Sequence, residues 1–342
     1  MELEDLMNES IQKLEGDFYS KKFYFSYSSL NKLLWNPAVF YQLYVLGIKE
    51  ERTDAHLVQG KIIHALLLEP EKFQEQFVVS PDNLPTGNTR IVVDRVFAHH
   101  QELAKNGDPR TELSEFQDAV LDVMRDMNYH QSLKTDQQRL DKIITNELCG
   151  YWNFLRTKGK KTLISQEDLV FCSNAVDLIK ADSNICKLIG CNSTEFDNTE
   201  VFNELPLSCS MAEKNFGLKG IVDNIVIDHD RKILYINDVK TTSKELKDFP
   251  ETVEFYSYWM QAVIYCTLVS INFQHLLEKG YDVQFHFIVV DKNFQTYAFP
   301  VKESTLNDWI GRLTTCLNKA EWHYLNRSYS LPYDFATKSI SL

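Results

Sequence analysis

The residues best suited to catalysis or metal binding lie in the segment Gly220–Lys240, GIVDNIVIDHDRKILYINDVK. Asp223 lies within one apolar run of this segment, and Asp238 and Lys240 end a second. Apolar, β-branched runs of this length predict two strands, and Asp228–Arg231 between them predicts a hairpin turn. Side chains alternate along a strand, so Asp238 and Lys240 point to the same side. If the strands pair, Asp223 can lie beside Asp238, and two carboxylates and a lysine meet at one end of a sheet.

Such a group of side chains can bind a metal and act on phosphate esters. Two carboxylates, with a backbone carbonyl such as that of Val239, supply the hard oxygen ligands that Mg²⁺ and Mn²⁺ prefer. A metal held there can orient a water, lower its pKa and neutralise charge on a scissile phosphate. Lys240 can stabilise the pentavalent phosphorus or help to place the attacking water, and its role as base or electrostatic stabiliser stays open. The segment is therefore compatible with metal-dependent phosphodiester hydrolysis.

The context of Asp238 and Lys240 matters more than their spacing. Acids make up 48 of the 342 residues, so an ordinary ion pair at the end of a surface strand is the alternative. The same spacing occurs in Asp230–Lys232, within the predicted turn, and in Glu245–Lys247, within a polar segment. Only Asp238 and Lys240 end a long apolar strand, where ionisable side chains need a partner.

Two further pairs of residues lie four positions apart, which places each pair on one face of a helix. Gln261 and Tyr265 lie in the predicted helix that follows the lysine strand. Gly60 and His64 lie in the predicted helix Ala55–Leu68, and a neutral imidazole can bind Mn²⁺ and, less well, Mg²⁺. The ordinary alternatives are a buried tyrosine with a local glutamine hydrogen bond and a histidine that binds no ligand.

The elements that must position these residues change in character along the chain. The expected helices are Phe25–Leu46 (broken at Pro37, with Ser26 or Ser28 as the cap), Ala55–Leu68, most of Val92–Leu188 with one interruption at Arg156–Lys161, Val253–Val269 and Ser304–Tyr324. The expected strands are Glu200–Leu207, Leu218–Ile227, Lys232–Lys240, Asp282–Val290 and Thr296–Val301. This order predicts an α/β fold with a large helical elaboration in the N-terminal half.

Composition sets the broad class of protein. Apolar residues make up 44% and charged residues 25% of the chain, values typical of globular proteins. The net charge of −12 excludes attraction of nucleic acid by the whole surface, although a local basic groove stays compatible with it. The acidic N-terminus predicts no signal peptide, and the most apolar helical stretch, Ala262–Ile271, is too short for a membrane span. Seven irregularly spaced cysteines predict reduced thiols, and hence a cytoplasmic protein.

Together these residues resemble the RecB/RecE-type branch of the PD-(D/E)xK nucleases, which carries G-x-x-x-H, G-x-x-D, D-x-K and Q-x-x-x-Y in this order. The corresponding residues here are Gly60–His64, Gly220–Asp223, Asp238–Lys240 and Gln261–Tyr265. The segments SYSSLNKLLWNPAVFYQLYVLG and GKIIHALLLEPEKF also resemble the N-terminal part of exonuclease-eight-type phage and prophage proteins. The resemblance runs over residues 25–300 and is least specific at residues 95–195.

The resemblance implies a restriction-endonuclease-like core, in which helices flank a mixed sheet. By position, it implies that His64, Asp223, Asp238 and the carbonyl of Val239 bind the metal. It implies that Lys240 is the catalytic lysine.

It also implies roles for three further residues. Gln261 and Tyr265 are expected to orient the lysine or to contact the DNA backbone. Members often add an upstream acid, and Glu204 fits its spacing better than Glu200 does.

The activity implied by the resemblance is processive 5′-to-3′ digestion of one strand of linear duplex DNA, with Mg²⁺ or Mn²⁺. Such enzymes work in phage-type recombination beside a single-strand annealing protein, and they can form homo-oligomeric rings. Related nucleases with an iron–sulfur cluster place one cysteine before the core and three after it; the cysteines here do not, so no cluster is expected. The chain lacks a P-loop and a dinucleotide fingerprint, so no nucleotide cofactor is expected either.

Because the chain is acidic, its DNA contacts are expected to be local. The candidates form a basic turn just after Tyr151 and Trp152, and they are Arg156, Lys158, Lys160 and Lys161. A solvated basic loop is the alternative interpretation. The expected organisation is an acidic segment (1–24), a helical part of the core with the G-x-x-x-H motif (25–90), a helical insertion (91–195), the α/β nuclease core (196–327) and a C-terminal tail (328–342).

Two other functions stay open at this level. A structure- or sequence-specific endonuclease of the same fold would use the same residues on a different substrate. A non-cleaving module that binds protein or imitates DNA would suit the acidic surface, although it would not need to keep the acids and the lysine.

Overall fold

The computed structural model describes residues 3–48, 55–81, 84–191 and 198–340. The chain divides into two compact units, of which the first comprises Met1–Pro70 and Ser173–Leu342 and the second Glu71–Cys172. The candidate residues on the hairpin, the histidine helix and the glutamine–tyrosine helix all belong to the first unit, whereas the basic turn belongs to the second. The expected boundary at residues 195–196 lies outside the described residues.

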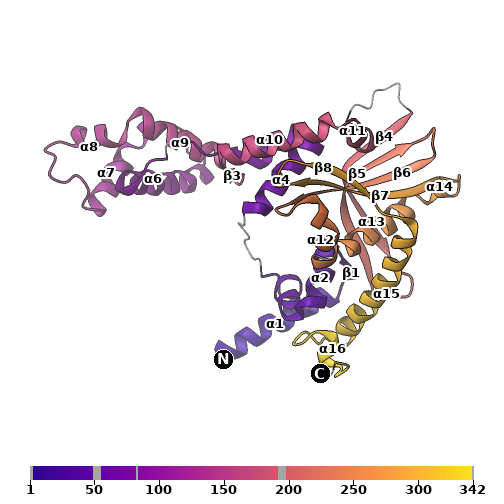
Figure 1. Cartoon of the computed structure of the whole chain (residues 1–342). Coiled ribbons are helices and arrows are strands. Elements are labelled where there is room, and N and C mark those ends of the chain that lie inside the picture. The colour runs from indigo at the N-terminus through magenta and orange to yellow at the C-terminus, as the bar shows by residue number, and fades with distance from the viewer. Residues whose placement is uncertain (1–2, 49–54, 82–83, 192–197, 341–342) are drawn as a thin grey trace. The chain divides into compact units, whose positions relative to one another are not determined.

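A mixed sheet of six strands forms the centre of the first unit, as described by these residues (Figure 1). The strands are β1 (Phe23–Phe25), β4 (Thr199–Ser210), β5 (Phe216–Asp228), β6 (Ile233–Thr242), β7 (Asp282–Asp291) and β8 (Thr296–Pro300). Strand β5 pairs with β4 on one side, and with β1 and then β6 on the other. Strand β7 runs parallel to β6, and β8 antiparallel to β7. Together with its flanking helices, this mixed sheet confirms the predicted α/β class and architecture.

Helices cover both faces of this sheet (Figure 1). Those of the first unit are α1 (Leu3–Tyr19), α2 (Tyr27–Trp35), α3 (Pro37–Phe40) with a π-helical turn (Tyr41–Val45), α4 (Ala55–Leu68), α11 (Ser183–Ile189), α12 (Phe249–Phe255), α13 (Tyr258–Asn272), α14 (Gln274–Leu277), α15 (Glu303–Asn326) and α16 (Tyr333–Ala336). Helix α13 is apolar on nearly every side and lies between the sheet and α15, so it is buried. Helix α11 packs against β5 and β6 on the opposite face.

Several predicted elements have the predicted bounds and signals. Helix α4 spans the predicted Ala55–Leu68, and the preceding helical segment is interrupted as expected, at Asn36, so that Pro37 begins α3. Ser26 caps α2, because its hydroxyl accepts the backbone N–H of Ser29 while the Ser29 hydroxyl accepts that of Ser26. The predicted single helix Val253–Val269 is wrong: it is split into α12 and α13 at Ser257, whose φ of +57° is incompatible with an α-helix.

The second unit has its own helical core. Its main elements are α5 (Phe73–Gln76), α6 (Gly87–Lys105), α7 (Gln117–Asp126), α8 (Asp136–Ile143), α9 (Asn146–Lys158), the start of α10 (Gln166–Ala181) and a parallel pair of strands, β2 (Phe77–Val79) and β3 (Thr162–Ile164). Its core includes Val96, Phe116 and Trp152. The prediction of one interruption between Val92 and Leu188 is wrong, because capping residues such as Thr135 and Thr145 begin further helices within this range.

None of the helices in the described part of the chain combines the length and the apolar character needed to cross a bilayer.

Candidate metal centre and active site

The candidate site lies where β6 separates from β5. Antiparallel pairing of these strands ends at Asn224 opposite Asn237, so that Asp223 and Asp238 follow at the next position of the same register. There the backbone N–H of Val239 donates to the Asp223 carboxylate at 2.9 Å instead of to a backbone carbonyl. A side chain thus takes over the hydrogen bond that would continue the ladder. We call this point, where β5 and β6 separate, the fork. The two aspartates lie side by side there on adjacent strands, as the sequence predicts.

The alternation of side chains between the two faces of the sheet is interrupted in β5 near Asp223. Val222 and Ile225 both lie in the main hydrophobic core, although strict alternation would turn them to opposite faces. In β4, Glu204 stands opposite Asp223 between two regular pairs and has a φ of +48°. This left-handed conformation costs a residue with a side chain roughly 1–2 kcal/mol. The local distortion directs the Glu204 carboxylate to the candidate site.

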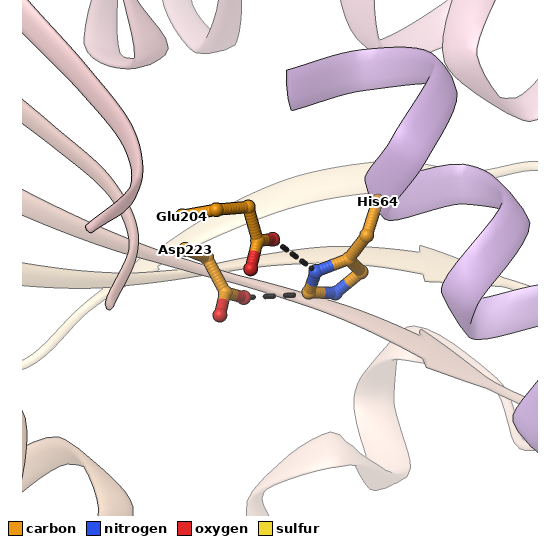
Figure 2. A group of neighbouring side chains, drawn as sticks. All are labelled: His64, Glu204 and Asp223. Carbon is orange, nitrogen blue, oxygen red and sulfur yellow. Dashed lines mark hydrogen bonds and ion pairs between the residues drawn. The ribbon is translucent and has the colours of Figure 1, made fainter. Parts of the chain in front are cut away.

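Three side chains from three elements meet at the fork (Figure 2). His64 of α4 has its Nδ1 3.2 Å from Oε1 of Glu204 and its Nε2 3.6 Å from Oδ2 of Asp223. The same Nε2 lies 3.0 Å from the carbonyl oxygen of Val239. One ligand atom each of His64, Glu204 and Asp223 lies within 4.8 Å of the others. Residues about 140 positions apart in the chain are thereby brought within reach of one cation.

The electrostatic field at the fork is negative. Burial lowers the pKa of His64, but the carboxylates of Asp223 and Glu204 outweigh this effect and raise it to about 9. Without a metal, the imidazole is therefore protonated at neutral pH and donates to Glu204 and to the Val239 carbonyl. The same two carboxylates that stabilise this positive charge would also favour a bound cation.

Asp238 and Lys240 form a buried ion pair beside these residues. Oδ2 of Asp238 lies 2.6 Å from Nζ of Lys240, and the aspartate is fully buried. Burial raises the pKa of Asp238 to about 7, against the lowering effect of Lys240 and with a further raising effect from Asp223. Burial lowers the pKa of Lys240, but Asp238 and Asp223 outweigh it, so its pKa is raised and the ammonium keeps its proton. The common orientation predicted for these two side chains is confirmed.

Gln261 and Tyr265 lie on the buried face of α13 that covers β5. Nε2 of Gln261 donates to the Tyr265 hydroxyl at 2.9 Å. Burial raises the pKa of Tyr265 far above its ordinary value, and the charges of Asp223 and Asp238 raise it further, so the phenol stays neutral. The two side chains are thus hydrogen-bonded to each other. That they orient Lys240 stays a prediction.

The glycine of the G-x-x-D motif has a steric role. A β-carbon at Gly220 would lie 2.9 Å from Cε1 of Tyr265 and 3.2 Å from Cδ1 of Leu268. Only a residue without a side chain lets the tyrosine ring approach β5 this closely.

A row of asparagines, which the sequence analysis did not identify, lies one residue from the acids. Asn203, Asn224 and Asn237 face each other across β4, β5 and β6. The amide of Asn237 donates to Oδ1 of Asn224, and that of Asn224 to Oδ1 of Asn203. The remaining amide hydrogen bonds reach carbonyls at the ends of two helices, and their acceptors are Leu68 in α4 and Leu188 and Ile189 in α11.

A signal for this row exists in the sequence. Each acid of the fork has an asparagine as its immediate neighbour, in Asn203–Glu204, Asp223–Asn224 and Asn237–Asp238. A polar pair within an apolar strand places one polar side chain on each face of the sheet. The asparagines therefore fix the strands and helix α4 from behind while the acids face the site.

Two sets of sequence candidates remain, one in each unit. Glu200 contacts His229 at 2.8 Å, so of the two upstream acids Glu204 is the one at the fork. The predicted basic turn is partly helical, because Arg156 and Lys158 lie in the last turn of α9 in the second unit and the helix ends at Gly159, whose φ is +49°. Within it, Arg156 pairs with Glu112 at 3.0 Å, and Lys160 is exposed. Contact of Arg156, Lys158, Lys160 and Lys161 with DNA stays a prediction.

The residues at the fork fit a hard divalent cation. Imidazole nitrogen, carboxylate oxygens and a backbone carbonyl are ligands that Mg²⁺ and Mn²⁺ accept. Oδ1 of Asp238 is buried and has no hydrogen-bond partner among the described residues, although an uncompensated buried carboxylate oxygen is costly. A cation at the fork would satisfy this oxygen and replace the proton of His64 as the source of positive charge.

Comparison with known proteins agrees with this chemistry. The PD-(D/E)XK nuclease superfamily model matches residues 24–323. A solved structure of a candidate exonuclease from Eubacterium rectale is 12% identical, with 87% of this chain and 80% of that chain covered and a TM-score of 0.43. The structure of the protein SSO0001 is 17% identical, with 48% of this chain and 70% of that chain covered and a TM-score of 0.23. No curated protein matches the chain. Because the family model spans most of its length, the chain belongs to the PD-(D/E)XK nuclease superfamily.

Proposed function

We propose that the protein is a Mg²⁺- or Mn²⁺-dependent exonuclease that digests linear double-stranded DNA, in the 5′-to-3′ direction. The observation that carries this proposal is the convergence of His64, Asp223 and the buried Asp238–Lys240 pair on one fork of the sheet. These residues come from distant parts of the chain, and an ordinary surface ion pair would need neither the histidine nor the second aspartate.

The chain's own residues would hold the cation and place the reacting groups. The ligands would be the imidazole nitrogen of His64 and the carboxylates of Asp223 and Glu204, which lie within 4.8 Å of one another, together with the carbonyl of Val239. Asp238 would join them through its unpartnered Oδ1. When bound, the cation supplies Lewis-acid chemistry at a phosphoryl oxygen and lowers the pKa of a water.

Lys240 serves best as an electrostatic stabiliser. Two neighbouring carboxylates hold its ammonium in the protonated form, which cannot accept a proton from water. A fixed positive charge instead favours the pentavalent phosphorane, which carries more negative charge than the diester. Gln261 and Tyr265 support the site from α13, because their hydrogen bond holds the tyrosine ring against Gly220.

The choice of an end-dependent enzyme rests on the order of the four motifs. G-x-x-x-H, G-x-x-D, D-x-K and Q-x-x-x-Y follow one another here as in the exonuclease-eight-type proteins of phages and prophages. By that resemblance we also propose a role in phage-type recombination, beside a single-strand annealing protein and with a ring of identical subunits.

The test is digestion of duplex DNA with Mg²⁺ or Mn²⁺. The expected result is that linear DNA is digested, closed circular DNA is not, and a 5′ label is released before a 3′ label. Asp238→Ala and Lys240→Ala should each lose at least about a hundredfold in rate. The matched control is Glu245→Ala with Lys247→Ala, because this exposed pair has the same spacing and a 2.8 Å ion pair.

Other outcomes would point elsewhere. Cutting of closed circles would contradict end dependence and favour a structure- or sequence-specific endonuclease. If both site variants were as active as the wild type, the assignment of the site would be wrong. If calorimetry detected no Mn²⁺ binding and no DNA were cut, a non-cleaving module would be favoured.

A further inference from the structure

A chain of aromatic rings leads from the candidate catalytic lysine to solvent. Nζ of Lys240 lies 5.1 Å from the ring centroid of Tyr258. The Tyr258 ring stacks on that of Tyr256 with centroids 5.5 Å apart, and Tyr256 meets Phe255 edge-on at 4.9 Å. Exposure rises outward along this series, to 49% for Tyr256 and 65% for Phe255. An aromatic surface is therefore continuous with the active site.

The backbone holds this surface in place. Helix α12 ends at Phe255, and Ser257, in the left-handed region, is the N-cap of α13, so that Phe255 and Tyr256 lie at the corner between two helices. The hydroxyl of Tyr27 donates to the carbonyl of Tyr256, and its ring lies 6.3 Å from that of Tyr258. The corner is thus anchored to α2, while the two outer rings stay accessible to a ligand.

Two carboxylates lie on α12 near this surface, and Glu251 is the exposed one farther along the chain from Phe255. The neighbouring Glu254 is neutralised by Arg312, whose two guanidinium nitrogens lie 3.0 and 2.7 Å from its carboxylate oxygens. Arg312 in turn lies over the ring of Trp259, with 4.0 Å between its central carbon and the ring centroid. The nearest carboxylate on the same helix therefore does not present an unpaired negative charge to a DNA backbone.

We propose that Phe255 and Tyr256 form a stacking platform for unpaired nucleobases of the DNA strand whose phosphate lies at Lys240. This inference rests on the proposed nuclease function and deepens it, because it names frayed or single-stranded ends as the preferred substrate. Aromatic side chains stack on every base and so bind unpaired strands without sequence preference. In a paired duplex the base faces are stacked on one another, so the terminal pairs must open before the platform is used.

The kinetic test compares two linear duplexes that differ only in their ends, one fully paired and one with three mismatched terminal pairs. The wild type is expected to have a lower KM for the mismatched end. Phe255→Ala with Tyr256→Ala should raise this KM about tenfold, leave kcat within about twofold and abolish the preference. Tyr256→Phe keeps the ring and should behave as the wild type. Phe335→Ala, which removes a similarly exposed ring (53%) on α16, is the control.

A binding test separates this proposal from the proposed function. DNA with 2-aminopurine in a single-stranded overhang is titrated with protein in Ca²⁺, and a gel verifies that the DNA stays intact. The wild type and Phe335→Ala should quench the fluorescence through stacking, and the double alanine variant should not. Equal quenching by all three proteins, or an equal loss of kcat on both kinds of end, would overturn the platform. If the wild type cleaves no DNA, the nuclease proposal fails and the fluorescence alone decides.

Discussion

Asp238 and Lys240 are two residues apart on β6, and their charged groups lie 2.6 Å apart in a region that excludes most solvent. The aspartate has no exposed surface and the lysine side chain only 13%. Each charge is therefore tolerated mainly because the other is present. The pair carries the candidate chemistry and also controls the stability of the strand.

Breaking this pair from one side should cost more stability than removing it altogether. Lys240→Met and Asp238→Asn should each lower the free energy of unfolding by about 3–5 kcal/mol, because each leaves a buried polar or charged group without its partner. The double variant should recover most of this loss while staying inactive. Urea denaturation and DNA cleavage, measured on all four proteins, check both statements. Additive losses of stability in the double variant would contradict the pairing argument.

Gly220→Ala should act through Tyr265. The added methyl group would overlap the tyrosine ring at 2.9 Å, so the ring must move and the protein should lose about 1–3 kcal/mol of stability. We expect roughly tenfold lower cleavage activity, because Tyr265 lies close enough to Asp223 for the carboxylate to raise its pKa. Gly311→Ala is the control: its β-carbon meets nothing within 4 Å on α15, and it should be neutral or up to about 1 kcal/mol more stable.

Metal affinity should rise with pH. In the metal-free protein the carboxylates raise the pKa of His64 to about 9, and a metal can bind its imidazole only after that proton has left. Between pH 7.5 and 8.5 the Mn²⁺ affinity is therefore expected to increase up to about tenfold, with one proton released per metal. Calorimetry in buffers of different ionisation enthalpy measures this release. His64→Gln should bind Mn²⁺ more weakly and without this dependence; an unchanged slope would show that His64 is not a ligand.

Glu204 should show opposite effects on stability and on metal binding. Its φ of +48° is strained for glutamate and natural for glycine, so Glu204→Gly should keep or raise the stability, by up to about 1 kcal/mol. The same change removes a carboxylate from His64 and should weaken Mn²⁺ binding. Glu204→Gln keeps the strain and loses the charge, and it separates the two effects. Thermal unfolding and Mn²⁺ titration of both variants provide the measurement; a large loss of stability in Glu204→Gly would contradict the strain.

The parts of the fold that follow local rules could be predicted from the sequence. Alternation placed Asp238 and Lys240 on one side of a strand, and helical spacing placed Gln261 and Tyr265 on one face. Both relationships depend only on neighbours within one element. The hairpin between β5 and β6 was equally accessible, because its turn lies between two apolar runs.

The features that could not be predicted depend on contacts between distant residues. Glu204 adopts a left-handed conformation that its residue type does not favour, in a strand that must place an acid beside His64. Ser257 divides the predicted helix in two, although serine carries no strong signal for such a break. Where the pairing ends at Asn224, the N–H of Val239 donates to the Asp223 carboxylate, and no local pattern encodes this contact.

The asparagine row has a consequence for how the chain finds its native pairing. If β6 slipped by one residue against β5, Asp238 and Lys240 would turn beneath α11, and Asn237 would face the catalytic side. In that arrangement the amides would no longer reach the carbonyls of Leu188 and Ile189, and the Asp238–Lys240 pair would lie on the opposite face from His64. The two polar rows, one on each face of the sheet, thus both disfavour the misaligned register and favour the native strand pairing at the candidate site.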